Sequence, residues 1–161
     1  RKKILKRTCP NKVIIEGAGI LTKCGVGASF NNMIGFPFEN RELIFETIKL
    51  NKRLFEMNNR FESNVFMFLP YKGTELYDIC RENGLLSTEI CSHGHSLSDE
   101  SILNFPEEYK EELKGLMKTF NLYVKLPEKY WPQIKIAEKS NEEGVAMFKH
   151  LSQLLSSGSG R

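Results

Sequence analysis

Apolar runs that end at a proline and lead into an acidic helix start occur twice in this sequence. Residues 26–36 have the pattern of a strand and are followed by a helical pattern over 40–55. Residues 64–69 have the pattern of a second strand, with a helical pattern over 74–83 after it. Strand, loop and helix in this order form the repeating unit of parallel α/β sheets and barrels. The pattern therefore predicts an α/β fold with functional groups in the loops after the strands.

The predicted elements also have predicted buried faces. Asn11 is a candidate N-cap for a helix over 12–23 that ends at Gly25. Thr74 is a candidate N-cap for the helix that ends before Gly84. The near-continuous apolar end of the first strand predicts burial on both of its faces. In the helix over 40–55 the predicted inward stripe is Leu43, Thr47, Leu50 and Leu54, widened by Ile44 and Ile48.

The second half of the sequence has a different organisation. Residues 1–86 hold the two strand and helix units, and a polar connecting segment runs to residue 105. Residues 106–155 have a helical pattern that is interrupted at Pro127 and Pro132, and we expect them to form a helical cap. The Ser/Gly-rich tail 156–161 is linker-like, and we expect it to be disordered. The inward faces predicted in the cap are Leu113, Leu116, Met117 and Phe120, and then Val145, Phe148, Leu151 and Leu155.

Composition narrows the class of protein. The 161 residues, of which 40% are hydrophobic, suffice for one domain with its own core. A formal net charge of +3 gives no field strong enough to indicate a nucleic-acid partner, and the basic run 1–7 has the pattern of a solvated helix turn. Since the sequence starts at Arg1 inside that run, it fits a segment cut from a longer protein. No apolar stretch approaches the ~18 residues that span a bilayer, so we expect a cytoplasmic protein without a membrane partner.

Metal-ligand residue types are present without a metal-binding spacing. The cysteines are too few and too far apart for a disulfide scaffold, which favours reduced thiols. The spacing of the cysteines and histidines matches no common zinc pattern, and no sequence feature orients a catalytic Cys-His pair. Cys80 lies on the apolar face of the third helix, where cysteine acts as a small hydrophobe. The residues considered are Cys9, Cys24, Cys80, Cys91, His93 and His95.

The two loops after the strands are the candidate sites. Gly35 permits close approach of a ligand or another backbone, and its apolar neighbours suit a flat ring such as adenine. The alternative is that Gly35 only permits a tight turn into the helix. The segment 70–75 lacks the Gly-x4-Gly-Lys-Ser/Thr spacing of a phosphate loop. We expect this second loop to be structural, with Tyr71 packing and Gly73 turning.

Several segments together resemble the later part of radical S-adenosylmethionine enzymes, particularly those that carry a cobalamin-binding domain upstream. Their order and spacing carry the resemblance, because no single motif in them is specific. The matching segments are residues 2–7, 32–42, 68–77, 82–85, 102–106 and 119–127.

The resemblance implies a partial (β/α)6 barrel of the TIM type. The chain would supply the fifth and sixth strands with their helices, preceded by the helix of the fourth unit and followed by a terminal helical cap. It implies that Met33 lies against the adenine of S-adenosylmethionine and that Gly35 makes room for the ring. It further implies contacts to the same ring from Phe68, Leu69 and Pro70, and a contact to the cosubstrate carboxylate from Arg7.

The sequence departs from this family at one decisive point. Radical S-adenosylmethionine enzymes bind a [4Fe-4S] cluster through three closely spaced cysteines, and this sequence has no such triplet. It also lacks the glycine-rich turn that holds the methionine amine. The cluster ligands would therefore belong to the N-terminal portion of the parent enzyme, which is the implied partner. We predict that the segment by itself is catalytically inert, and the use of cobalamin and the substrate stay open.

Two other hypotheses remain. The chain is alternatively a non-catalytic α/β interaction domain in which both loops are structural. A third hypothesis is pairing of two copies, because a sheet of two or three parallel strands leaves edges and an apolar face open to water.

Overall fold

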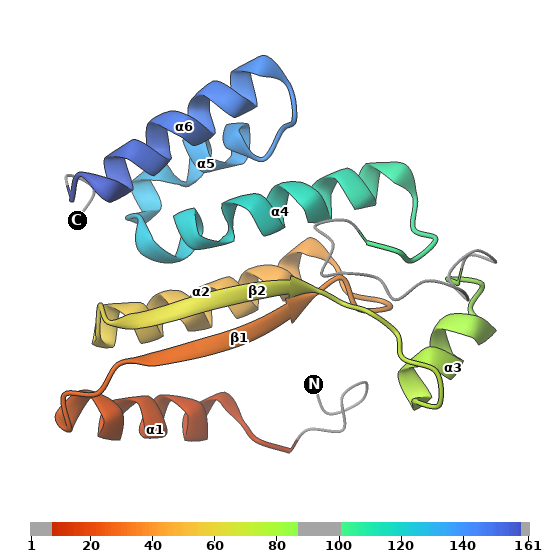
Figure 1. Ribbon diagram of the computed structural model, residues 1–161, viewed down its shortest axis with the longest axis horizontal. Helices are drawn as coiled ribbons and strands as arrows, with labels where there is room; N and C mark the ends of the chain where they lie inside the picture. Colours follow the sequence, from red (N-terminus) through yellow and green to blue (C-terminus); the bar gives the residue numbers. More distant parts are fainter. Residues whose placement is uncertain (1–7, 87–100, 159–161) are drawn as a thin grey trace.

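A two-stranded parallel sheet lies at the centre of the chain. The computed structural model describes residues 8–86 and 101–158 (Figure 1). Strand β1 (Ala28–Ile34) pairs in parallel with β2 (Phe61–Met67), with Asn31 opposite Asn64. Helix α2 (Arg41–Met57) connects the strands, and α1 (Asn11–Lys23) packs beside α2. The fold is thus α/β with a small parallel sheet, as the sequence predicts.

The remaining helices follow β2. The short helix α3 (Glu75–Glu82) comes first, and an isolated antiparallel bridge joins Leu86 to Leu103. Helix α4 (Glu107–Lys125) then packs against both α2 and β2. The 3-10 helix η2 (Glu128–Tyr130), α5 (Trp131–Ala137) and α6 (Glu142–Ser156) complete the fold, with α5 and α6 packed on each other and on α4 (Figure 1).

Local signals in the sequence fix most helix ends. The side chains of Asn40, Thr74 and Asn141 each accept a hydrogen bond from a backbone N–H in the first turn of α2, α3 and α6. The predicted cap Thr74 is therefore confirmed. The predicted cap Asn11 is wrong by one residue, because α1 begins at Asn11 and Pro10 stands at the N-cap without a side-chain hydrogen bond. Similarly, Pro132 does not interrupt a helix but lies in the first turn of α5, where its missing N–H costs nothing.

The first strand is shorter than predicted at both ends, the second is shifted toward the N-terminus, and the predicted burial of the first strand is wrong. Buried and exposed positions alternate along β1, so that Ile34 is fully buried while Met33 is 43% exposed. The helices cover one face of the sheet and leave the other open, which produces the period of two. The second strand begins at Phe61 and not at residue 64, because Phe61 and Ser63 alternate with exposed positions and extend the ladder.

Most of the inward residues predicted for α2 and α6 are buried or pack against the core, but the prediction is wrong for Leu43 and Val145. Leu43 is 46% exposed, whereas Ile44 and Ile48 are fully buried against α4 and the sheet. Val145 is 57% exposed on α6, while Leu151 is buried. A helix that packs against two elements at once buries the side between them, and the sequence does not show where the second element lies.

A polar network lies between α2 and the sheet. Asn51 is 1% exposed, and its amide exchanges two hydrogen bonds with the amide of Asn32, at 2.8 and 3.0 Å. The Ser63 hydroxyl donates to Asn51 Oδ1 at 2.9 Å, and Asn51 Nδ2 also donates to the Thr47 carbonyl. Buried polar groups are tolerated when all of them are paired in this way. The network therefore fixes the register of α2 on both strands.

Replacement of Asn51 tests this network. We expect Asn51→Ala to lower the free energy of unfolding by about 1–3 kcal/mol, because Ser63 and Asn32 lose their buried partner. Urea unfolding followed by far-UV circular dichroism measures the change. The control is Asn59→Ala at an exposed turn position, which should stay within about 0.5 kcal/mol of wild type. Equal stability of the two variants would contradict the role given to Asn51.

Candidate functional site

The face of the sheet that the helices leave uncovered carries a defined set of side chains. By strand alternation these belong to Ser29, Asn31, Met33, Glu62, Asn64 and Phe66, which we call the open face. Asn64 Nδ2 donates to Ser29 Oγ at 2.9 Å and to Asn31 Oδ1 at 3.0 Å. Toward the carboxyl ends of the strands, Met33 stands opposite Phe66. The open face therefore changes from polar to apolar along the strands.

The loop from Gly35 to Asn40 follows β1 at this apolar end. Gly35 has a φ of 84° and Phe38 a φ of 63°, and the Phe38 side chain is 64% exposed. A positive φ is unusual for a bulky residue and stores strain in the loop. The carboxylate of Glu39 holds the loop by accepting hydrogen bonds from the N–H groups of Gly35, at 2.6 Å, and Phe36, at 3.2 Å. Burial raises the pKa of Glu39, partly offset by these two hydrogen bonds.

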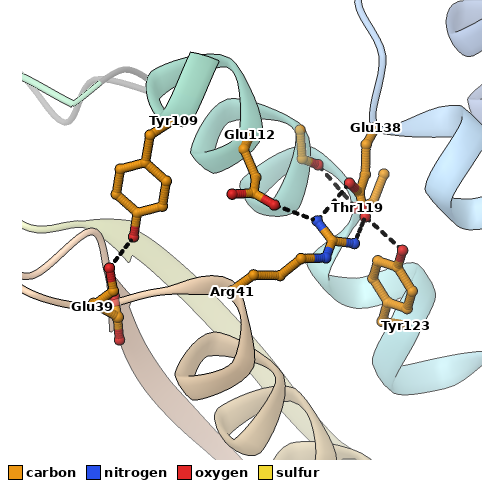
Figure 2. A network of polar contacts seen from close by, with 8 residues as sticks. Glu39, Arg41, Tyr109, Glu112, Thr119, Tyr123 and Glu138 are labelled. Atoms are coloured by element: carbon orange, nitrogen blue, oxygen red, sulfur yellow. Dashed lines mark hydrogen bonds and ion pairs between the residues drawn. The ribbon is translucent and has the colours of Figure 1, made fainter. Parts of the chain in front are cut away.

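The same loop is attached to α4. The hydroxyl of Tyr109 donates to the backbone carbonyl of Glu39 at 2.7 Å, as Figure 2 shows. Burial of Tyr109 raises the pKa of its phenol, so the hydroxyl keeps its proton and remains a donor. The loop therefore has one fixed contact with the C-terminal helices.

Arg41 supplies a second attachment at the start of α2. Its guanidinium makes two hydrogen bonds to Glu138, at 2.7 and 2.9 Å, and one to Glu112 at 3.1 Å (Figure 2). The Tyr123 hydroxyl donates to the same Glu138 carboxylate at 2.5 Å, and the guanidinium lies 4.8 Å from the ring centre of Phe45. The contact with Glu138 raises the pKa of Arg41. A bidentate pair of this kind fixes orientation as well as distance.

The structure places the residues that the resemblance implies at different depths. Met33 lies on the open face and Gly35 lies two residues further along. Phe68 is 4% exposed and Pro70 is also buried, with Phe68 packed against Phe36, Cys80 and Leu103. Leu69 is half-buried between them. The side chain of Phe68 is thus part of the core under α3, and Arg7 lies outside the described residues.

Gly35 has a close neighbour within the chain itself. A Cβ atom at this position would lie 2.8 Å from Met67 Sδ and 3.5 Å from Leu113 Cδ1. The second loop holds Gly73 at a φ of 83°, which confirms the predicted turn. Tyr71 is 67% exposed, so the prediction that it packs is wrong.

The described residues offer no metal-binding cluster. Within 8–86 and 101–158, no three His, Cys, Asp or Glu side chains converge in a way that could hold a metal ion. Cys80 is fully buried among apolar side chains, and that burial raises the pKa of its thiol. Cys91, His93 and His95 lie outside the described residues.

A hollow lies near the amino ends of the strands. It has a volume of about 880 Å³ and is lined by residues that include Lys52, Arg60 and Lys125. These cations already have partners in the chain: Lys52 donates to the Leu126 carbonyl, Arg60 to a backbone carbonyl, and Lys125 pairs with Glu62 at 2.5 Å. The hollow is therefore a place where helix ends are joined.

Sequence reasoning missed the ion pairs that hold the first loop. No short motif links Arg41 to these partners. In the sequence, Glu112 lies 71 positions after Arg41, Tyr123 82 positions and Glu138 97 positions. One signal was available, because a cation in the first turn of a helix opposes the helix dipole and needs a compensating anion. Arg41 occupies that position.

Comparisons with known proteins identify no family for this chain. No protein-family model, no curated protein and no solved structure matches the chain. In the part of the chain that the structure describes, no helix has the length and apolar character needed to cross a membrane.

The close contact at Gly35 predicts a difference between two glycines with the same backbone conformation. We expect both Gly35→Ala and Gly73→Ala to lose about 1 kcal/mol of stability from the positive φ. Gly35→Ala should lose about 1–2 kcal/mol more, because its Cβ meets Met67 while nothing lies within 4 Å at Gly73. Chemical denaturation of the two variants measures the difference. Equal losses would show that Met67 moves aside freely.

The raised pKa of Glu39 predicts a pH dependence of stability. A carboxyl whose pKa is higher in the folded state favours folding most at low pH, and this contribution is lost as pH rises through the folded pKa. Relative to Glu39→Gln, wild type should therefore lose stability as pH rises from below 4.5, the ordinary pKa of a Glu carboxyl, toward neutrality. Thermal unfolding across this range provides the measurement, with exposed Glu42→Gln as control. The prediction fails if Glu42→Gln changes the pH profile as much as Glu39→Gln does.

Proposed function

We propose that this chain forms part of the adenine wall of an S-adenosylmethionine site, as the carboxyl-terminal half of a radical S-adenosylmethionine enzyme. One observation carries the proposal: Met33 is 43% exposed on the open face, at the carboxyl end of β1 and two residues before the turn at Gly35. Parallel sheets bind ligands at the carboxyl ends of their strands. An exposed apolar side chain at that end is suited to cover a flat ring.

The chemistry of the strand end supports a purine in particular. A thioether makes favourable contacts with aromatic rings, worth about 0.3–1.5 kcal/mol each. Met33 stands opposite Phe66 in the ladder, so a ring on the open face would meet a thioether and a phenyl group together. The amides of Asn31 and Asn64 lie two positions earlier and supply donors and acceptors of the kind that a purine edge requires. In this proposal these residues contribute van der Waals contacts and hydrogen bonds to the purine and take no part in a chemical step.

The arrangement of helices supports a barrel wall. Both strands run in the same direction, and α1, α2 and α4 pack against the side chains of one face. In a barrel of this kind helices cover the outside and side chains of the opposite face point inward. The open face would then line the interior of a (β/α)6 barrel completed by further strands.

The residues present do not fit an iron–sulfur cluster. Neither the cysteine spacing of the sequence nor the described side chains provide three converging ligands. The cluster, and with it the electron that cleaves the cosubstrate, would belong to the N-terminal portion of the parent enzyme. The proposal therefore assigns binding and orientation of the cosubstrate to this chain and no redox step.

A non-catalytic interaction domain is the second candidate, and the two loops support it. Phe68 packs in the core, Pro70 is also buried, and the space beside Gly35 is taken by Met67. Glu39 occupies the N–H groups at the end of β1. These contacts within the chain account for the conformation of both loops without a bound ligand.

Methyl NMR of the five methionines separates the two candidates. With 5′-methylthioadenosine as the probe, the Met33 methyl resonance should shift in a saturable manner, at a millimolar Kd because only part of the site is present. The methyl resonances of Met117 and Met147, which pack against the core, should stay in place. Met33→Lys should abolish the shifts of neighbouring resonances, whereas Val145→Lys, at a similarly exposed position on α6, should leave them unchanged. Absence of a saturable shift at Met33 up to the solubility of the probe would favour the interaction domain.

A further inference from the structure

The loop after β1 contains a tight turn with an unfavourable residue in it. The N–H of Glu39 donates to the carbonyl of Phe36 at 3.1 Å, which closes a four-residue turn around Pro37 and Phe38. Proline fixes a negative φ at the second position, and Phe38 at the third position has a φ of 63°. These signs of φ are those of a type II turn, whose third position is normally glycine. Among the described residues, Phe38 is the one non-glycine residue with a positive φ.

The loop after β2 contains the same kind of turn with the expected residue. The N–H of Thr74 donates to the carbonyl of Tyr71 at 3.2 Å, and Gly73 occupies the third position with a φ of 83°. Both strands of the sheet are thus followed by this turn, at the end where parallel sheets bind ligands. Of the two turns, the first alone carries a side chain at the third position. The turn geometry by itself therefore does not require one.

The side chain of Phe38 gives no packing in return for this strain. A left-handed conformation is unfavourable for every residue with a Cβ atom. Burial of the phenyl ring could offset the cost, but Phe38 is 64% exposed and belongs to none of the apolar clusters in the described part of the chain. Its neighbours differ, since Phe36 packs against Phe68 and Pro37 is buried. Packing of the described residues therefore does not explain the phenyl group at this position.

The backbone on both sides of Phe38 is fixed. The Glu39 carboxylate accepts hydrogen bonds from the N–H groups of Gly35 and Phe36, and the Glu39 carbonyl accepts one from Tyr109. A side chain that is presented on a fixed backbone loses less freedom when it binds a ligand. Backbone strain that the surrounding structure maintains in this way is concentrated at ligand-binding sites. The observations together indicate that Phe38 contacts a ligand.

The position of Phe38 in the fold indicates which ligand this is. Phe38 lies five positions after Met33, on the loop into which β1 leads. Nucleobases stack on aromatic side chains because every base has a π-face. We propose that the phenyl ring of Phe38 contacts the adenine ring that is bound at Met33. This proposal rests on the proposed function and assigns to the site a residue that the resemblance does not imply.

Glycine substitution tests the strain. Phe38→Gly should lower the equilibrium constant of unfolding about threefold, because glycine adopts a positive φ at no steric cost and its freedom in the unfolded chain offsets only part of the gain. Tyr71→Gly is the matched control, because Tyr71 is 67% exposed in the other turn and has no positive φ. It should raise that constant or leave it unchanged in urea unfolding. A Phe38→Gly chain that is no more stable than wild type overturns the proposal.

The same variants test the contact, with 5′-methylthioadenosine as the probe. Loss of one stacked aromatic ring weakens binding of a base at least about fivefold. Phe38→Gly should therefore raise the Kd read from the Met33 methyl shift by at least this factor. Phe38→Tyr, which keeps a ring, and Tyr71→Gly should keep the wild-type Kd. Intermolecular NOEs should connect the adenine protons with the Phe38 ring, whose resonances are identified by their loss in Phe38→Leu.

The outcomes separate this proposal from the proposed function. A saturable Met33 shift with an unchanged Kd in Phe38→Gly overturns the Phe38 contact and leaves the adenine wall in place. Equal weakening by Phe38→Gly and Tyr71→Gly also overturns the contact, because the effect then does not depend on the Phe38 ring. Absence of any saturable shift at Met33 in wild type overturns both proposals.

Discussion

Two parallel strands have a side-chain surface on each of two faces, and the helices of this chain cover one of them. This one-sided burial determines the alternation along β1, where Ile34 enters the core and Met33 remains exposed. It also explains why polar groups are distributed unequally. The polar groups under α2 form a closed network around Asn51. Asn31 and Asn64 on the open face need fewer hydrogen-bond partners within the chain, because water can bind their remaining donors and acceptors.

The loop after β1 owes its shape to charges contributed from far along the chain. Glu39 binds two strand-end N–H groups, and Arg41 binds Glu138 through both of its terminal nitrogens. Glu39 lies in the loop just before α2 and Arg41 is the first residue of α2, so the C-terminal helices fix the position of the strand end through this loop and the start of α2. The side chain of Glu138 is only 11% exposed, which means that removal of Arg41 would leave a poorly solvated carboxylate. The C-terminal helices therefore act as the support on which the candidate site is positioned.

Local features of the sequence predicted the helices, the strands and several helix ends. Contacts between elements that are distant in the sequence could not be predicted from it. Thr74 and Gly84 bound α3 as predicted, because capping and positive φ depend on neighbouring residues alone. Both Leu43 and Ile44 were predicted to face inward, and only Ile44 does, because the exact side that α2 buries depends on where α4 packs, which no local pattern encodes. Arg41 and Glu138 are 97 positions apart, and their pairing follows from the fold rather than from any motif. At the candidate site, the sequence placed Met33 and Gly35 at a strand end but did not show that Phe68 turns into the core.

The outer edge of β1, with which no described strand pairs, and the open face meet at Met33. The backbone of this residue faces the edge, while its side chain stands on the open face opposite Phe66. A strand added at the edge would pair the Met33 backbone and place a new row of side chains beside the thioether. Met33 would then lie in the middle of a three-stranded surface instead of at its margin. An apolar side chain in such a position is shielded on both sides, and a flat ring laid on it would be removed from water over more of its area.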